Sequence, residues 1–202
     1  MEDWVRRALA KWPNVPALYG WLGLDRRGRW LIRGELITRP QIIDTINRNY
    51  AADERGCWYF QNGPQRGYVQ LAYAPLILRR VDDSEVLWTH TGRRVDRPER
   101  AWLDEEGSLL LQTEHGPGLL DDAELDWALQ RLRGADGSAV DEDCLADALQ
   151  RPAGADAGLS WLLGDTRLAV RRLDAAGVPD ALGFVREPES DAVTASAAGD
   201  PL

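Results

Sequence analysis

Histidine, cysteine and long apolar runs are scarce in this sequence of 202 residues. The two cysteines, Cys57 and Cys144, stand alone without a C-x-x-C pair, so we expect buried thiols rather than a disulfide or a nucleophile. The two histidines, His90 and His115, lack the spacing of zinc ligands, and we expect satisfied or exposed surface side chains. These residues therefore predict neither a metal site nor a cofactor.

The sequence also lacks the features of membrane and nucleic-acid proteins. No apolar run reaches the roughly 18 residues of a membrane span, and the start, Met1 to Trp4, is acidic where a signal peptide is basic and then apolar. The formal net charge is -9, with basic residues interspersed among acidic ones, which opposes binding to nucleic acid or an anionic membrane. We expect a cytoplasmic protein that binds neither.

Recognisable catalytic motifs are missing as well. There is no P-loop, no G-x-S-x-G elbow and no G-x-G-x-x-G after a strand. Carboxylates are plentiful, but they fall in tight turns and helix starts, where they stabilise the local backbone. The favoured interpretation is a non-catalytic binding or regulatory module that senses a small anionic ligand or contacts a protein partner. A small hydrolase using carboxylate chemistry is the alternative.

The stretch from Tyr19 to Tyr50 organises the rest of the sequence. Its first part predicts a β-hairpin, with Asp25 opening a type I turn and Gly28 supplying the positive φ that closes it. Its second part predicts a helix, with Thr38 as N-cap and Gln41 completing a capping box. Hairpin followed by capped helix is thus the basic unit.

A second unit with weaker sequence similarity to the first follows in the second half. Leu103, Asp104 and Gly107 repeat the hairpin pattern 79 positions after its first occurrence. A second capping box, Asp121 to Glu124, then predicts a helix with Leu125, Leu129 and Leu132 on one face. Such internal repetition with unequal copies indicates duplication.

The predicted fold is α+β, with two unequal repeats of a β-hairpin/helix/β-meander unit and an N-terminal helix packed on the sheets. Short β-prone runs predict the meander strands, and residues 140–149 predict a further helix. Exposed strand edges and nine tryptophans suggest a homodimer. The predicted ranges are 1–18 for the N-terminal helix and proline connector, 19–95 and 96–186 for the repeats, and 187–202 for a disordered tail. The predicted strands are 57–60, 68–73, 76–78, 86–89, 160–163, 168–173 and 182–185.

Four spaced patterns carry a resemblance to known proteins: residues 28–30, 34–40, 53–59 and 69–75. In these patterns the sequence resembles an uncharacterised bacterial family of unknown function, found mainly in proteobacteria. The resemblance covers roughly residues 19–111, and it implies two-part proteins with repeated α+β motifs. For that family a role in signal transduction or ligand sensing is suggested. It has no established catalytic residues, so the resemblance implies none here.

The best candidate for a site is polar and cationic. Guanidinium groups recognise carboxylate or phosphate through paired hydrogen bonds, and neutral amides fix the orientation of a ligand. Residues of both kinds gather in the first helix and the hairpin after it, and the alternative is that they cap the helix or are merely solvated. The predicted ligand-binding residues are Arg39, Asn47, Arg48, Gln61, Asn62 and Arg66.

Overall fold

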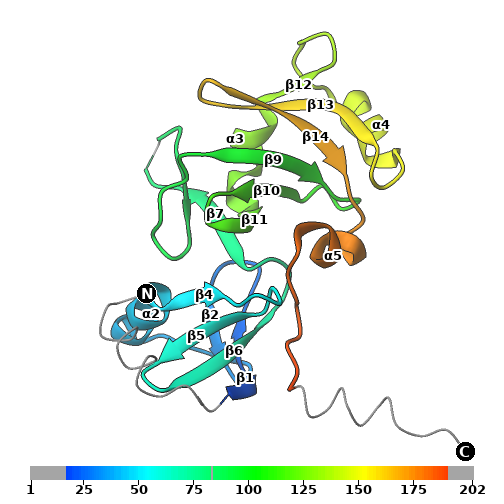
Figure 1. Cartoon of the computed structure of the whole chain (residues 1–202). Coiled ribbons are helices and arrows are strands. Elements are labelled where there is room, and N and C mark those ends of the chain that lie inside the picture. The colour runs from blue at the N-terminus through cyan, green and yellow to red at the C-terminus, as the bar shows by residue number, and fades with distance from the viewer. Residues whose placement is uncertain (1–16, 83, 191–202) are drawn as a thin grey trace, which may run out of the picture. The chain divides into compact units, whose positions relative to one another are not determined.

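The computed structural model describes residues 17–82 and 84–190 and shows a mixed α and β protein with two large sheets and few helices (Figure 1). The chain divides into two compact units. Unit 1 extends to Tyr73 and resumes at Gly183, while unit 2 is Ala74–Leu182. Residues 74–95, predicted in the first repeat, thus belong to unit 2. The predicted N-terminal helix and residues 191–202 of the predicted tail lie outside the described residues.

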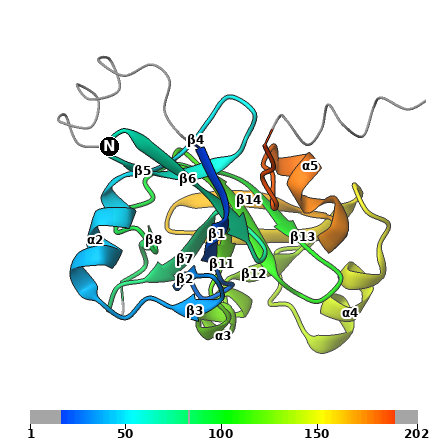
Figure 2. The same cartoon turned by 90° about the horizontal axis from the view of Figure 1, so that it is seen from below.

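Unit 1 is built on a six-stranded sheet in the order β3-β2-β1-β6-β5-β4. Figure 2 shows β1 between β2 and β6, and its pairing with β6 is the one parallel pairing of this sheet. The hairpins predicted near Asp25 and Asn62 are both present. The strands are β1 (Ala17–Leu24), β2 (Trp30–Ile32), β3 (Glu35–Leu36), β4 (Tyr50–Ala52), β5 (Trp58–Asn62) and β6 (Gln65–Leu71).

The D-x-x-G turns form as their local chemistry predicts. The Gly28 amide donates to the Asp25 carbonyl at 3.1 Å, and Gly28 has a φ of 69°. The Asp25 carboxylate also accepts the amides of Arg27 and Arg29. Gly107, with a φ of 85°, closes the turn at Asp104 in the same way. Aspartate at the first position and glycine in the left-handed region are what such a turn requires.

Helix α2 (Pro40–Arg48) places Ile46 in the core of unit 1. The largest core side chains there are aromatic: Trp30 and Tyr50 lie edge to face with centroids 5.0 Å apart, and Tyr50 lies 4.8 Å from Trp58. The capping box predicted at Thr38 is wrong. Arg39 is the N-cap residue, and its carbonyl accepts the amides of Ile42 and Ile43. Its side chain makes no cap, because a guanidinium has no hydrogen-bond acceptor.

Unit 2 is built on an eight-stranded sheet in the order β12-β13-β14-β9-β10-β11-β7-β8. Two pairings are parallel, β14 with β9 and β11 with β7, and the others are antiparallel. The strands are β7 (Leu76–Arg80), β8 (Leu87–Thr89), β9 (Pro98–Leu103), β10 (Leu109–Thr113), β11 (Gly116–Leu120), β12 (Leu132–Gly134), β13 (Asp156–Leu163) and β14 (Thr166–Arg172).

Helices of unit 2 follow the sequence signals only in part. The predicted helix over 140–149 is confirmed as α4 (Glu142–Gln150), which the Asp141 carboxylate caps by accepting the Cys144 amide at 2.8 Å. The other helical elements are η1 (Asp122–Glu124), α3 (Leu125–Leu129), η2 (Ala175–Gly177) and α5 (Val178–Leu182). Two predictions are wrong: Leu132 belongs to β12 rather than a helix, and no strand forms over 182–185, where α5 ends.

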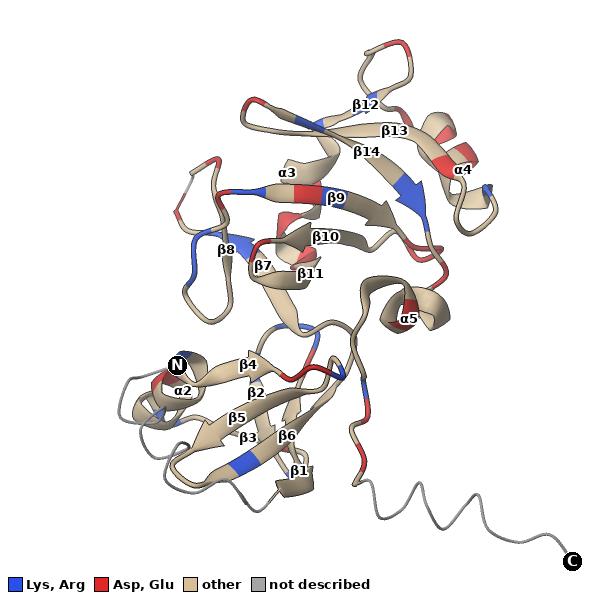
Figure 3. Ribbon diagram, viewed as in Figure 1, with Lys and Arg blue, Asp and Glu red and all other residues tan. Residues whose placement is uncertain are grey.

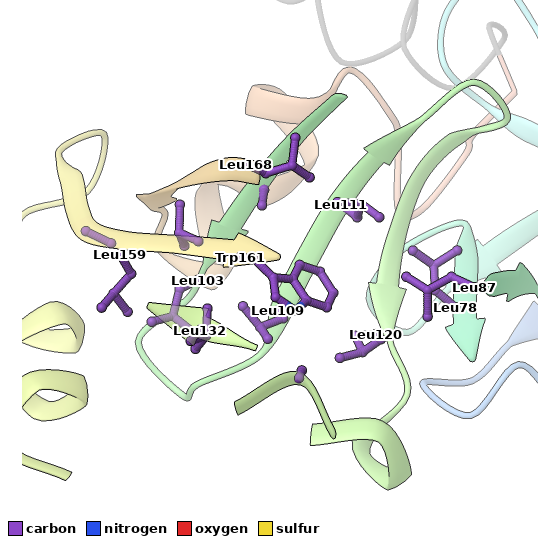
Figure 4. Close-up of a cluster of buried hydrophobic side chains, with 14 of the residues drawn as sticks. Leu78, Leu87, Leu103, Leu109, Leu111, Leu120, Leu132, Leu159, Trp161 and Leu168 are labelled. Carbon is purple, nitrogen blue, oxygen red and sulfur yellow. The ribbon is translucent and has the colours of Figure 1, made fainter. Parts of the chain in front are cut away.

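The core of unit 2 brings α3 and α4 onto one side of the sheet (Figure 4). Trp161 on β13 is fully buried among leucines, and its ring centroid lies 6.1 Å from that of Trp127 on α3. Alternate residues of each strand face this cluster, as the period of two in a strand requires. Tryptophan is thus a packing residue here and at Trp30 and Trp58.

Charged residues are interspersed over both units (Figure 3). Acidic residues group on α4, which carries Glu142, Asp143 and Asp147. Within the described residues, no helix is both long and apolar enough to cross a membrane.

Candidate ligand site

The sheet of unit 1 separates the six predicted site residues into two groups. Asn47 and Arg48 belong to α2, and Arg39 is its N-cap residue, on the side of the sheet that carries Trp30. The Trp30 indole donates to the Asn47 side-chain oxygen at 2.8 Å, so this oxygen takes part in the packing of the core. Arg39 and Arg48 are exposed at the two ends of the helix.

Gln61 and Arg66 face the other side of the sheet. They form a cross-strand pair between β5 and β6, next to the pair formed by Tyr59 and Tyr68. Because side chains alternate along a strand, these four share one face, opposite Leu71 and its partners. Asn62 is exposed at the hairpin turn. The structure therefore brings together Gln61 and Arg66 but not the α2 residues.

Three tyrosines form the floor of this face. Tyr19 of β1 stacks on Tyr68 with ring centroids 4.6 Å apart and planes 2° from parallel. Tyr59 meets Tyr68 at 5.9 Å and 60°. Cross-strand aromatic pairs of this kind stabilise a sheet and present a flat, polarisable surface. Tyr59 and Tyr68 are buried, whereas Tyr19 is half-buried.

Arg66 lies over this floor and is held in place from two directions. Its guanidinium carbon lies 4.6 Å from the centroid of Tyr59, and its Nε donates to Gln61 Oε1 at 3.1 Å. Gln61 is itself buried, with its amide nitrogen donating to the carbonyls of Gly63 and Gln65. No carboxylate among the described residues lies within ion-pair distance of Arg66. A half-buried guanidinium is thus oriented without a carboxylate partner from residues 17–82 or 84–190.

The turn after β4 forms the wall of the site. Asp53 Oδ1 accepts the amides of Arg55 and Cys57, at 3.0 and 2.9 Å. Its Oδ2 accepts the Tyr68 hydroxyl at 3.1 Å and pairs with Arg55 at 3.3 Å. Both carboxylate oxygens of Asp53 therefore have hydrogen-bond partners, from its own turn and from Tyr68, and the charge of Arg55 is balanced by Asp53.

Together the floor and the wall border an open depression of about 520 Å³. We call it the tyrosine–arginine depression, and it is lined by Ala52, Asp53, Glu54, Arg55, Tyr59, Arg66 and Tyr68. The two arginines and two acids in its lining carry no net formal charge. An anion placed here would be held by direct hydrogen bonds from Arg66 and not by a long-range electrostatic field.

Burial raises the pKa of the Tyr68 hydroxyl above its ordinary value; the Arg66 guanidinium opposes this shift, and the Asp53 carboxylate adds to it. The folded state thus holds this proton more tightly than the unfolded chain does. The resulting stability is complete below the ordinary tyrosine pKa of about 10 and is lost as pH rises through and beyond that value.

We therefore expect wild-type protein to lose stability above about pH 10 more steeply than Tyr68→Phe. Urea unfolding between about pH 8 and about pH 11 measures the difference. Tyr50, whose buried hydroxyl also has a raised pKa, is present in both proteins and cancels. If the free energies of unfolding of the two proteins fell equally with pH, the assignment of this pH dependence to Tyr68 would be wrong.

Tyr19, Asp53, Arg55, Tyr59 and Tyr68 are the site residues that sequence reasoning missed. The β-prone runs that contain Tyr59 and Tyr68 were predicted as strands, so their alternation was readable. What the sequence could not supply was the register that sets Tyr59 opposite Tyr68 and Gln61 opposite Arg66. The predicted polar residues at α2 are close to Gln61 and Arg66 along the chain, but they lie on the opposite face of the sheet.

Asp104 and the two histidines make hydrogen bonds within the fold. The buried Asp104 accepts the amides of Glu106 and Ser108 at 2.9 and 2.7 Å. His90 Nδ1 accepts the Ile77 amide, and His115 Nε2 lies 2.7 Å from the Arg94 carbonyl oxygen. In the described part of the chain, no group of three or more His, Cys, Asp or Glu residues could hold a metal ion. The two cysteines form no disulfide.

Comparison with known proteins places the chain by fold and family. A crystal structure of a DUF1285 family protein from Silicibacter pomeroyi DSS-3 has a TM-score of 0.51 at 13% identity, covering 81% of this chain and 86% of that one. A second DUF1285 structure, from Shewanella baltica OS155, has a TM-score of 0.40 at 16% identity, covering 51% and 85%. No curated protein matches. The family DUF2944, described as "Protein of unknown function (DUF2946)", matches residues 1–189, and the chain belongs to this family.

Proposed function

We propose that the chain is a non-catalytic binding module and that unit 1 binds a small anionic ligand in the tyrosine–arginine depression. The observation that carries the proposal is Arg66, which is half-buried, oriented by Gln61 and without a carboxylate partner among the described residues. A charged side chain that is partly withdrawn from water is stabilised by a counter-charge. A carboxylate or phosphate group supplies that counter-charge.

The geometry also favours a ligand with a flat apolar body. Nε is engaged by Gln61, and the guanidinium lies over the Tyr59 ring and also interacts with the Tyr68 hydroxyl. The remaining N–H groups of its two terminal nitrogens can bind the oxygens of a ligand. Tyr59 and Tyr68 are largely buried but line the depression, where the exposed parts of their rings can contact an aromatic group. An aromatic carboxylate or aryl phosphate combines both features.

Titration of the ¹⁵N-labelled protein with phenyl phosphate, followed by NMR, tests the proposal. We expect Arg66→Met to weaken binding at least about tenfold, because a hydrogen bond to a charged group contributes about 1.5 to 3 kcal/mol. Arg66→Lys keeps the charge but not the planar fork, so it should bind with intermediate affinity.

Arg39→Met is the matched control, because Arg39 is also an arginine predicted from the sequence to bind the ligand. It is exposed and lies on the other side of the sheet. We expect it to bind phenyl phosphate as the wild type does. If Arg39→Met weakens binding and Arg66→Met does not, the ligand binds at α2 and the proposed site is wrong. Unfolding curves recorded alongside exclude a loss of structure.

We also propose that the two sheets descend from one duplicated unit. In unit 1 the order is β3-β2-β1-β6-β5-β4, and six adjacent strands of unit 2 follow the corresponding order β11-β10-β9-β14-β13-β12. The central parallel pairs support this: Leu22 to Leu24 lie beside Val69 to Leu71, and Ala101 to Leu103 lie beside Val170 to Arg172. The 79-residue spacing seen in the sequence separates Leu22 of β1 from Ala101 of β9.

A further inference from the structure

We infer that unit 2 contains a second, smaller anion-binding site, centred on Arg167 at the β13–β14 hairpin. The choice of ligand class rests on the function proposed for unit 1, whereas the site itself consists of different residues. It occupies the same place in the strand order as the tyrosine–arginine depression does in unit 1.

Register identifies the corresponding residues. Val69 in β6 and Val170 in β14 occupy equivalent positions beside β1 and β9, and Arg66 and Arg167 each lie three residues before them. Arg66 is paired across the hairpin with Gln61, and Arg167 with Leu162. The next inward pair on the same face is Tyr59 with Tyr68 in unit 1 and Ser160 with Ala169 in unit 2. An arginine is thus present in both units, while the tyrosines are present only in unit 1.

The two arginines are also held alike. Arg167 donates from Nε to Ser160 Oγ at 2.8 Å, as Arg66 does to Gln61. Like Arg66, Arg167 has no carboxylate of the described chain within ion-pair distance. In both cases a neutral acceptor binds Nε and orients the guanidinium, and at Arg66 the Tyr68 hydroxyl engages it as well. Terminal N–H groups remain for a ligand in each case.

A depression of about 350 Å³ lies beside Arg167. It contains one acid, Asp156, whose Oδ1 accepts the Gly158 amide at 2.7 Å. The Ser160 hydroxyl, which accepts from Arg167, keeps its own proton for donation to a ligand. The lining residues are Gly134, Ala135, Asp156, Gly158, Leu159, Ser160, Arg167 and Ala169.

The difference between the two linings predicts a difference in ligand preference. In unit 1 the aromatic part of a ligand gains contact with Tyr59 and Tyr68, whereas in unit 2 Ser160 and Ala169 offer no ring. We therefore expect the Arg167 site to take a compact oxyanion, a carboxylate or phosphate group, without a preference for an attached ring. Arg167 is exposed, so its binding should be weaker than that at Arg66.

The test is an NMR titration of the full chain that follows the Nε–H signals of Arg66 and Arg167 with inorganic phosphate and, separately, with phenyl phosphate. Each signal should show a saturable shift. Phenyl phosphate should bind about fivefold more tightly than phosphate at Arg66, since an aromatic contact contributes about 1 kcal/mol, and within about twofold at Arg167. Arg66→Met should leave the Arg167 transition intact, and Arg167→Met should leave the Arg66 transition intact.

Arg171 provides the control, because it is an exposed arginine on the same strand that donates to the Gly154 carbonyl. If the Arg66 signal saturates and Arg167 shifts no more than Arg171, the second site is wrong and the proposed function of unit 1 stands. If Arg167 saturates but Arg66 does not, the function proposed for unit 1 fails while the second site stands. Loss of the Arg167 transition in Arg66→Met would also overturn a separate site in unit 2.

Discussion

Replacing Gly56 with alanine should destabilise unit 1 by about 2 to 5 kcal/mol. Gly56 has a φ of 78°, where an alanine costs about 1 to 2 kcal/mol. A Cβ atom at this position would also lie 2.5 Å from the Gly183 carbonyl oxygen, and overpacking adds about 1 to 3 kcal/mol. Urea unfolding followed by tyrosine and tryptophan fluorescence measures the loss.

The size of this effect depends on how the chain closes unit 1. The segment that returns from Gly183 bonds to the turn at Gly56, where the Val185 amide donates to the Gly56 carbonyl at 3.1 Å. The Leu71 amide then donates to the Arg186 carbonyl at 2.8 Å, and Val185 packs on the cluster of Cys57, Tyr59 and Tyr68. Gly56→Ala must displace this segment, so it should also weaken phenyl phosphate binding.

Gly107→Ala is the matched control. Gly107 closes the same kind of D-x-x-G turn with a φ of 85°, but a Cβ atom added at this position would have no neighbouring atom within 4 Å. It should therefore show only the conformational cost of about 1 to 2 kcal/mol. Equal losses in the two variants would mean that the close approach of Gly183 contributes nothing.

Replacing Arg172 with methionine should destabilise unit 2 by about 3 to 5 kcal/mol, the usual cost of removing one partner from a buried charged network. Only 3% of Arg172 is exposed. Its guanidinium donates to the carbonyls of Leu103 and Leu149, each at 3.0 Å, and to that of Leu173, and it pairs with Asp174 at 3.2 Å. Methionine fills much of the volume but leaves these acceptors without a donor.

Arg171→Met separates this network from a general effect of removing an arginine from β14. Arg171 is exposed and donates to the carbonyl of Gly154, so its replacement should cost less than about 1 kcal/mol. Chemical unfolding of both variants under the same conditions gives the comparison. A cost for Arg172→Met no larger than that for Arg171→Met would show that the buried carbonyls find water or other donors.

Short-range chemistry made part of the fold readable in advance. The turns at Asp25 and Asp104 follow from an aspartate and a glycine three residues apart, and α4 follows from Asp141 as N-cap before an amphipathic run. These signals act within a few residues, so no distant contact is needed to interpret them. Where a long-range contact competes, the prediction failed: Leu132 continues a helical pattern but pairs with Trp161 as part of β12.

The candidate site shows the same division. From the sequence alone, Arg39, Asn47 and Arg48 looked equivalent to Gln61 and Arg66, because all five are polar and close along the chain. By itself the sequence determined the turns, most strands and the capped helix α4. Only the tertiary structure decided that Asn47 accepts a hydrogen bond from Trp30, that Arg66 lies over Tyr59 and that Gly183 packs against Gly56. The reason is that strand register and the packing of the returning C-terminal segment depend on contacts between residues far apart in sequence.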